Sequence, residues 1–140
     1  MNVMKKIVFP IMLLTILIMI VTCKKEKESE NVSLLTAHPW MSDSLLADGM
    51  DVGAPGGILH GFSGETKFNT DGTGYVGIYD GEWNLSEDET ILSISSDSLP
   101  AKVFAVISEL TETSLKLSTL YPSPTTPGTL LDIRMTFIPK

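Results

Sequence analysis

Apolar and polar residues alternate strictly in the last segment of the chain. The apolar positions are Leu131, Ile133, Met135 and Phe137, and the polar positions between them are Asp132, Arg134 and Thr136. A period of two places these sets on opposite faces of a β-strand, one in a core and the other in water. The pattern therefore predicts a C-terminal strand with one buried face.

The same period recurs earlier in the second half of the chain. Residues 114–119 and 92–95 alternate in this manner, whereas Val103 to Ile107 is apolar at every position. Such a run predicts a more central strand, buried on both faces. We expect Trp83 and Phe104 to share one core with the apolar residues of the last strand.

Turn residues separate these segments at short intervals. Asp71-Gly72 stands between predicted strands at 65–69 and 73–79, where a tight turn needs positive φ. Asp80-Gly81, residues 87–89 and residues 111–113 predict further turns, and residues 122–128 predict a proline-rich loop. The glycine-rich stretch from Gly53 to Gly57 predicts a mobile loop over one end of the domain.

The sum of these elements is an all-β domain. A first strand is expected from Pro39 to Leu46 and a short one at 58–62, which gives seven or eight antiparallel strands. Strands joined to their sequence neighbours close most simply into a small up-and-down barrel. Helix is expected for no more than one turn, near residues 34–38.

The N-terminus has a different pattern. Lys5 and Lys6 precede an almost wholly apolar run from Ile7 to Val21, which would span only about 22 Å as a helix. This length falls short of a bilayer core of about 30 Å and is typical of a signal peptide, predicted here at residues 1–22. The alternative is an uncleaved anchor helix.

The end of this run resembles the lipobox of bacterial lipoproteins. The residues Ile20-Val21-Thr22-Cys23 carry the resemblance, and Cys23 is the only cysteine. It implies cleavage before Cys23, a lipid on its thiol and a fatty acyl group on its new amino terminus, so the membrane becomes a partner. Because Lys24 is not the aspartate associated with inner-membrane retention, the resemblance implies the outer membrane of the cell envelope.

Charge separates the anchor from the domain. Residues 23–33 comprise the lipidated cysteine and a polar, charged stretch that predicts a disordered tether, and residues 34–140 form the folded domain. The net charge of −7 becomes −9 when Lys5 and Lys6 leave with the signal peptide. Such an acidic domain disfavours nucleic acid as a partner.

Catalytic and metal-binding motifs do not emerge from the pattern. His38 and His60 lack a metal-ligand spacing, and the stretch from Gly61 to Glu65 does not complete a nucleophile elbow. An EF-hand alignment on Gly72 places Lys67 and Ile78 where acidic ligands are required. We therefore predict no enzyme, no metal and no cofactor.

The order of several blocks resembles the small lipocalin-like domains of bacterial lipoproteins. These blocks are Trp40 in the first strand, residues 68–74, 81–85, 92–94 and 107–117, and a terminal Met135-Thr136-Phe137. The resemblance implies a lipocalin-like barrel that binds a small apolar or amphipathic ligand. The candidate ligand-binding residues are the ring-bearing side chains of the strands: Trp40, Phe68, Tyr75, Trp83, Phe104 and Phe137. The alternative is a structural or accessory envelope lipoprotein whose filled barrel contacts a protein partner.

Overall fold

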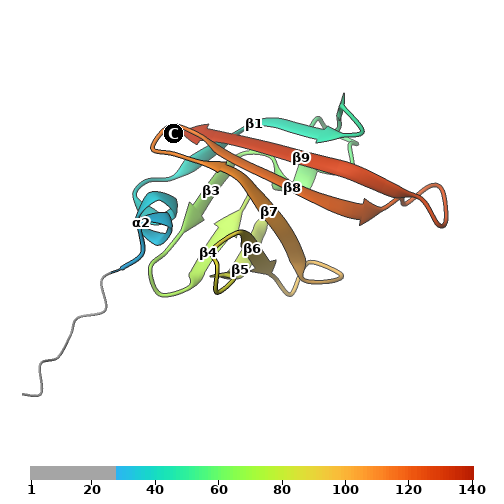
Figure 1. The fold of residues 1–140 in the computed structure, drawn as a ribbon. Coiled ribbons are helices and arrows are strands. Elements are labelled where there is room, and N and C mark those ends of the chain that lie inside the picture. Colours follow the sequence, from blue (N-terminus) through green and yellow to red (C-terminus); the bar gives the residue numbers. More distant parts are fainter. Residues whose placement is uncertain (1–27) are drawn as a thin grey trace, which may run out of the picture.

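The computed structural model describes residues 28–140. The predicted signal peptide, Cys23 and residues 24–27 of the predicted tether lie outside this range. One helix, one 3-10 turn and nine strands follow each other along the described chain (Figure 1). They are α2 (Glu30–Thr36), β1 (Trp40–Ala47), β2 (Met50–Asp51), η1 (His60–Phe62), β3 (Glu65–Phe68), β4 (Thr73–Val76), β5 (Tyr79–Leu85), β6 (Ile91–Ser95), β7 (Val103–Leu110), β8 (Leu115–Pro122) and β9 (Leu130–Pro139).

The strands form one antiparallel sheet that closes on itself. From β3 to β9 each strand pairs with its sequence neighbour, and β1 pairs with both β3 and β9. Eight strands therefore make a closed barrel, and β2 is a short extra strand beside β1. The predicted small all-β, up-and-down barrel is confirmed.

The inward-facing side chains fill the barrel. Leu115 and Leu117 on β8 lie opposite Phe137 and Met135 on β9, and all four are buried. Ile133, Leu92 and Ile94 are buried as their alternation predicted. This register is fixed because a shift of one residue would turn the apolar face of β9 into water.

Helix α2 covers the end of the barrel at which β1 begins. Ser29 caps the helix by accepting a hydrogen bond from Val32 N, and Leu35 is fully buried. The indole Nε1 of Trp40 donates to the Leu35 carbonyl at 3.1 Å, which ties the helix to β1. The helix is longer than the single turn expected and begins at Glu30, inside the stretch predicted as a disordered tether.

The segment between β2 and β3 closes a gap near the other end. Strand β1 pairs with β3 only at Trp40 and Met41, so the two strands separate beyond that point. Leu59 and Phe62 are buried in the opening, and the Phe62 ring lies 4.8 Å from that of Tyr79. The short strand expected at 58–62 is instead the 3-10 turn η1, because these residues pack across the strands.

Two glycines with positive φ form the turns on either side of β4. Gly72 has φ 87°, as expected for the turn between β3 and β4. The predicted turn at Asp80-Gly81 is wrong: both residues lie inside β5, and the chain reverses at Gly77, whose φ is 58°. A side chain at Gly77 would overlap the Gly61 carbonyl, so contact with the preceding segment selects glycine there.

The glycine-rich stretch expected as a mobile loop is a hydrogen-bonded turn. Gly57 N donates to Ala54 O at 2.8 Å, and Gly53 N donates to the Asp51 carboxylate at 2.9 Å.

No helix in the described part of the chain is long and apolar enough to cross a membrane.

Candidate functional site

Three of the six predicted ligand-binding rings lie in the core. Trp40 and Phe137 have no exposed surface, and Phe68 is 2% exposed. They come from β1, β9 and β3, whose alternation directs them inward. In this position they pack against other buried side chains, as the rings of a filled interior do.

Tyr75 and Trp83 are half-buried. The Trp83 indole meets the Phe68 ring edge-on at 5.6 Å, and its Nε1 donates to Asn69 O at 2.9 Å. The Tyr75 hydroxyl donates to the Glu65 carboxylate, on which Lys140 also closes a salt bridge. The hydrogen bonds that Lys140 and Tyr75 donate to Glu65, together with the charge of Lys140, lower the pKa of the Glu65 carboxyl group. The hydrogen bond to Glu65 raises the pKa of Tyr75.

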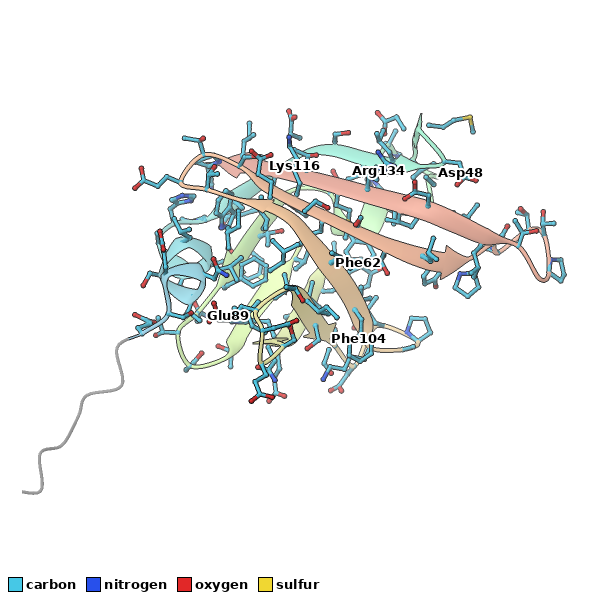
Figure 2. The ribbon with its side chains drawn as sticks, in the orientation of Figure 1. Asp48, Phe62, Glu89, Phe104, Lys116 and Arg134 are labelled. Carbon is cyan, nitrogen blue, oxygen red and sulfur yellow. The ribbon has the colours of Figure 1, made fainter. Side chains whose placement is uncertain are left out.

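Phe104 lies on the outside of the barrel. Its side chain is 59% exposed, so the expectation that it shares the core is wrong. Figure 2 shows it at the margin of the molecule, whereas Phe62 lies within. Val106, on the same face of β7, is 50% exposed. The run from Val103 to Ile107 is therefore apolar on both faces without being buried on both.

A hollow at the barrel wall is small. It has a volume of about 10 Å³ and is lined by residues of β3 to β6, among them Phe68, Tyr75 and Trp83. This is room for about one water molecule, whereas pockets for small ligands measure roughly 300–1,000 Å³. The structure thus brings three of the six rings to one hollow, but the hollow does not have the size of a ligand site.

A larger, open hollow lies on the outer surface of β7, β8 and β9. It has a volume of about 390 Å³, and six of its eight lining residues are polar, the others being Leu117 and Met135. Figure 2 labels two of the polar ones, Lys116 and Arg134. Its two cations are already paired, because Lys116 Nζ lies 2.6 Å from Glu109 and Arg134 lies 3.0 Å from Asp132. The hydrogen bond from Lys116 lowers the pKa of Glu109. An incoming anion would have to compete with these carboxylates.

The two histidines contact backbone carbonyl groups. His38 has its ring nitrogens 3.0 Å from Pro39 O and 3.1 Å from Glu112 O, and His60 Nδ1 lies 3.0 Å from Gly53 O. Across residues 28–140, no three His, Cys, Asp or Glu side chains gather as metal ligands would. The histidine contacts join segments of the fold.

The structure reveals an exposed apolar surface that the sequence reasoning did not identify. We call it the outer apolar stripe; it consists of Ile91, Phe104, Val106 and Leu120. Ile91 pairs across the strands with Val106, and Leu120 lies two residues beyond Ser118, the partner of Val106 on β8. The run from Val103 to Ile107 is apolar at every position, and this pattern indicated that both faces of the strand carry apolar side chains. The sequence alone does not distinguish an exposed apolar face from a buried one.

Family models and curated proteins offer no match for this chain.

Proposed function

We propose that this protein is a lipid-anchored protein of the bacterial envelope whose barrel is a non-enzymatic protein-binding module. The anchor is the diacylglycerol expected on Cys23, and the membrane is the outer membrane. The proposal for the anchor rests on Lys5 and Lys6, on the apolar run after them, and on the lipobox that ends in Cys23.

The observation that carries the binding mode is the filled interior. Sixteen apolar residues, from Leu35 to Phe137, form one buried cluster in the described chain. A small apolar ligand between them would have to displace packed side chains, and cores are as dense as organic crystals. Of the two functions predicted from the sequence, the filled interior favours an accessory protein that binds partners through its outer surface. It disfavours a carrier that holds a small ligand inside the barrel.

The outer apolar stripe supports a protein as the partner. Four large apolar side chains are exposed on the outer faces of the neighbouring strands β6, β7 and β8, with Leu120 at 63% and Phe104 at 59%. Contiguous apolar surface on a soluble domain marks interaction sites, and aromatic residues are enriched at their centres. Phe104 is the expected anchor of the contact.

The length of the tether adds a constraint on the partner. Six residues, 24–29, separate the predicted lipidated cysteine from the start of α2 at Glu30, seven Cα–Cα steps away. These seven steps span at most about 25 Å when fully extended. A domain held so close to the lipid surface meets partners that lie in or near the same membrane.

Photo-crosslinking in the cells that make the protein tests this function. The full chain carries a photoreactive amino acid at position 106 in one variant and at Glu82, an exposed polar site on β5, in the matched control. We expect a discrete protein adduct from position 106 that is absent from position 82 and is lost in a Phe104→Asp background.

Native mass spectrometry of the full chain in detergent supplies the opposing measurement. We expect the mass of the processed, acylated chain alone. A stoichiometric small molecule that survives detergent exchange, with no protein adduct from position 106, would show a carrier instead and overturn the proposal.

A further inference from the structure

Long and short side chains alternate on the outer face of β8 and β9. Lys116 lies opposite Thr136, and Ser118 lies opposite Arg134, so each long cation faces a short hydroxyl residue across the strands. The open hollow of about 390 Å³ lies among these residues, because the short side chains leave space that the long ones enclose. Figure 2 shows Lys116 and Arg134 along the same margin of the molecule. We call this space the polar hollow.

The floor of the polar hollow consists of backbone and hydroxyl groups. Leu117 and Met135 line it, yet each is only 2% exposed, since their side chains turn into the barrel. On β7 the register with β8 shifts at Ser108, and the Ser108 hydroxyl lies 3.3 Å from that of Ser118. Such β-bulges re-aim a side chain and are common beside functional sites. The polar hollow therefore offers groups that form hydrogen bonds.

The charges around the polar hollow cancel. Lys116 lies 2.6 Å from Glu109, and Arg134 lies 3.0 Å from Asp132, so two cations meet two carboxylates. The chain as a whole has a net charge of −7, which repels a further anion. A neutral polar ligand meets no such repulsion, so the polar hollow favours a neutral ligand over an anion.

The ion pair between Arg134 and Asp132 leaves further hydrogen-bonding groups exposed. Its two hydrogen bonds, from Nε at 3.3 Å and from Nη2 at 3.0 Å, both end on Oδ2 of Asp132. Within residues 28–140, Nη1 of Arg134 and Oδ1 of Asp132 form no hydrogen bond. A guanidinium group has five N–H donors, and an ionised carboxylate has only acceptors. The pair thus presents a charged donor and a charged acceptor close together.

We propose that the polar hollow binds a neutral saccharide, whose neighbouring hydroxyl groups bridge Arg134 and Asp132. A sugar hydroxyl is both a donor and an acceptor. One hydroxyl accepts from Nη1 of Arg134 while the next donates to Oδ1 of Asp132, and hydrogen bonds to charged groups are stronger than those between neutral groups. The saccharide displaces neither ion pair, as an anion would. The volume of about 390 Å³ lies within the range of roughly 300–1,000 Å³ for small-ligand pockets.

The residues around the polar hollow determine how tightly a saccharide binds. None of the eight lining residues is aromatic, so recognition rests on hydrogen bonds without a ring that stacks on the sugar. We therefore expect weak binding of a single saccharide, which multivalent display strengthens by about 10²- to 10⁴-fold. The polar hollow adjoins the outer apolar stripe, because Val106 pairs with Ser118. It is nevertheless a second site, and the inference goes beyond the proposed contact with a protein.

Binding of the full chain to an array of immobilised glycans tests the polar hollow. The protein is kept in a detergent with a zwitterionic head group, because a detergent with a sugar head group would compete. We expect binding to neutral glycans, and we expect an excess of the same saccharide in free form to abolish it. An array on which no neutral glycan is bound, or on which only acidic glycans are bound, would overturn the inference.

Two variants that remove charge but keep the size of the side chain test the residues. Arg134→Gln and Asp132→Asn should each lower the array signal by about tenfold, because each removes a hydrogen bond to a charged group. The matched controls Lys67→Gln on β3 and Asp97→Asn, both exposed and outside the polar hollow, should leave the signal unchanged. Thermal melts confirm that all four variants fold, as expected for an exposed ion pair. Equal binding by all four would overturn the inference.

Chemical-shift mapping by NMR then locates the bound saccharide. With the free saccharide that competes best on the array, we expect the largest shift changes at the amides of Ser118 and Thr136. Changes centred on Phe104 would assign the saccharide to the outer apolar stripe and overturn the polar hollow as its site. The crosslink from position 106 reports the protein contact separately, so failure of the saccharide site leaves the proposed function to its own test.

Discussion

Two phenylalanines on opposite faces of the sheet allow a matched test of the register. Phe137 on β9 has no exposed surface and lies opposite Leu115, whereas Phe104 on β7 is 59% exposed. We predict that Phe137→Ala greatly lowers the free energy of unfolding and that Phe104→Ala does not. Both variants remove the same atoms, so the difference between them measures burial.

The magnitude follows from the two environments. Burying a phenylalanine side chain contributes about 1.5–3 kcal/mol. Truncation also leaves a cavity of roughly 100 Å³, which adds up to about 2 kcal/mol at about 24 cal/mol per Å³ if the core does not relax. Phe137→Ala should therefore cost about 3–5 kcal/mol. Phe104→Ala removes the contact with Lys102, of about 0.5–1 kcal/mol, and little buried surface.

Urea titrations of the two variants and the unmodified chain supply the measurement. With a slope of about 2 kcal/mol per M, the loss at Phe137 moves the midpoint down by roughly 2 M. The midpoint of Phe104→Ala should fall by less than about 0.5 M. If Phe137→Ala does not fold, Phe137→Leu keeps most of the apolar volume and should still lose more stability than Phe104→Leu. Equal losses in both pairs would show that the faces of β7 or β9 are assigned wrongly.

Three further predictions concern the anchor, an unpaired hydroxyl and a surface ion pair. Cys23→Ser should abolish processing and membrane association; a variant that still fractionates with membranes at the cleaved size would contradict the lipoprotein proposal. Thr66→Val should raise the free energy of unfolding by about 1 kcal/mol, because the Thr66 hydroxyl is buried with no hydrogen-bond partner in the described residues. The control Ser93→Ala should lower that free energy, since Ser93 donates to Asn84 O; the opposite order in chemical denaturation would refute the assignment. Finally, the lowered pKa of Glu65 contributes stability that is present above the unfolded-state value of 4.5 and is lost as the pH falls through the folded-state pKa. Thermal melts of Glu65→Gln should therefore depend less on pH across this range than those of the unmodified chain, and parallel curves would count against it.

The sequence by itself determined the fold class and most of the strands. The alternation in β9 identified Ile133, Met135 and Phe137 as buried, because the period of a strand is a local property of the backbone. The sequence also identified Gly72 as a turn residue with positive φ, because the conformation of a tight turn depends on only about four consecutive residues.

Tertiary structure alone decided what lies across the sheet from each residue. Gly77 replaced Asp80-Gly81 as the turn because Gly61, distant in sequence, packs against it. The sequence neighbours of Phe104 are as apolar as those of a core residue. No other segment of the described chain, however, covers the outer face of β7, so Phe104 is exposed. The point at which β7 and β8 stop pairing, beyond Val106 and Ser118, is likewise a property of the assembled sheet. Burial and strand separation depend on contacts between distant segments, and a local pattern carries no record of them.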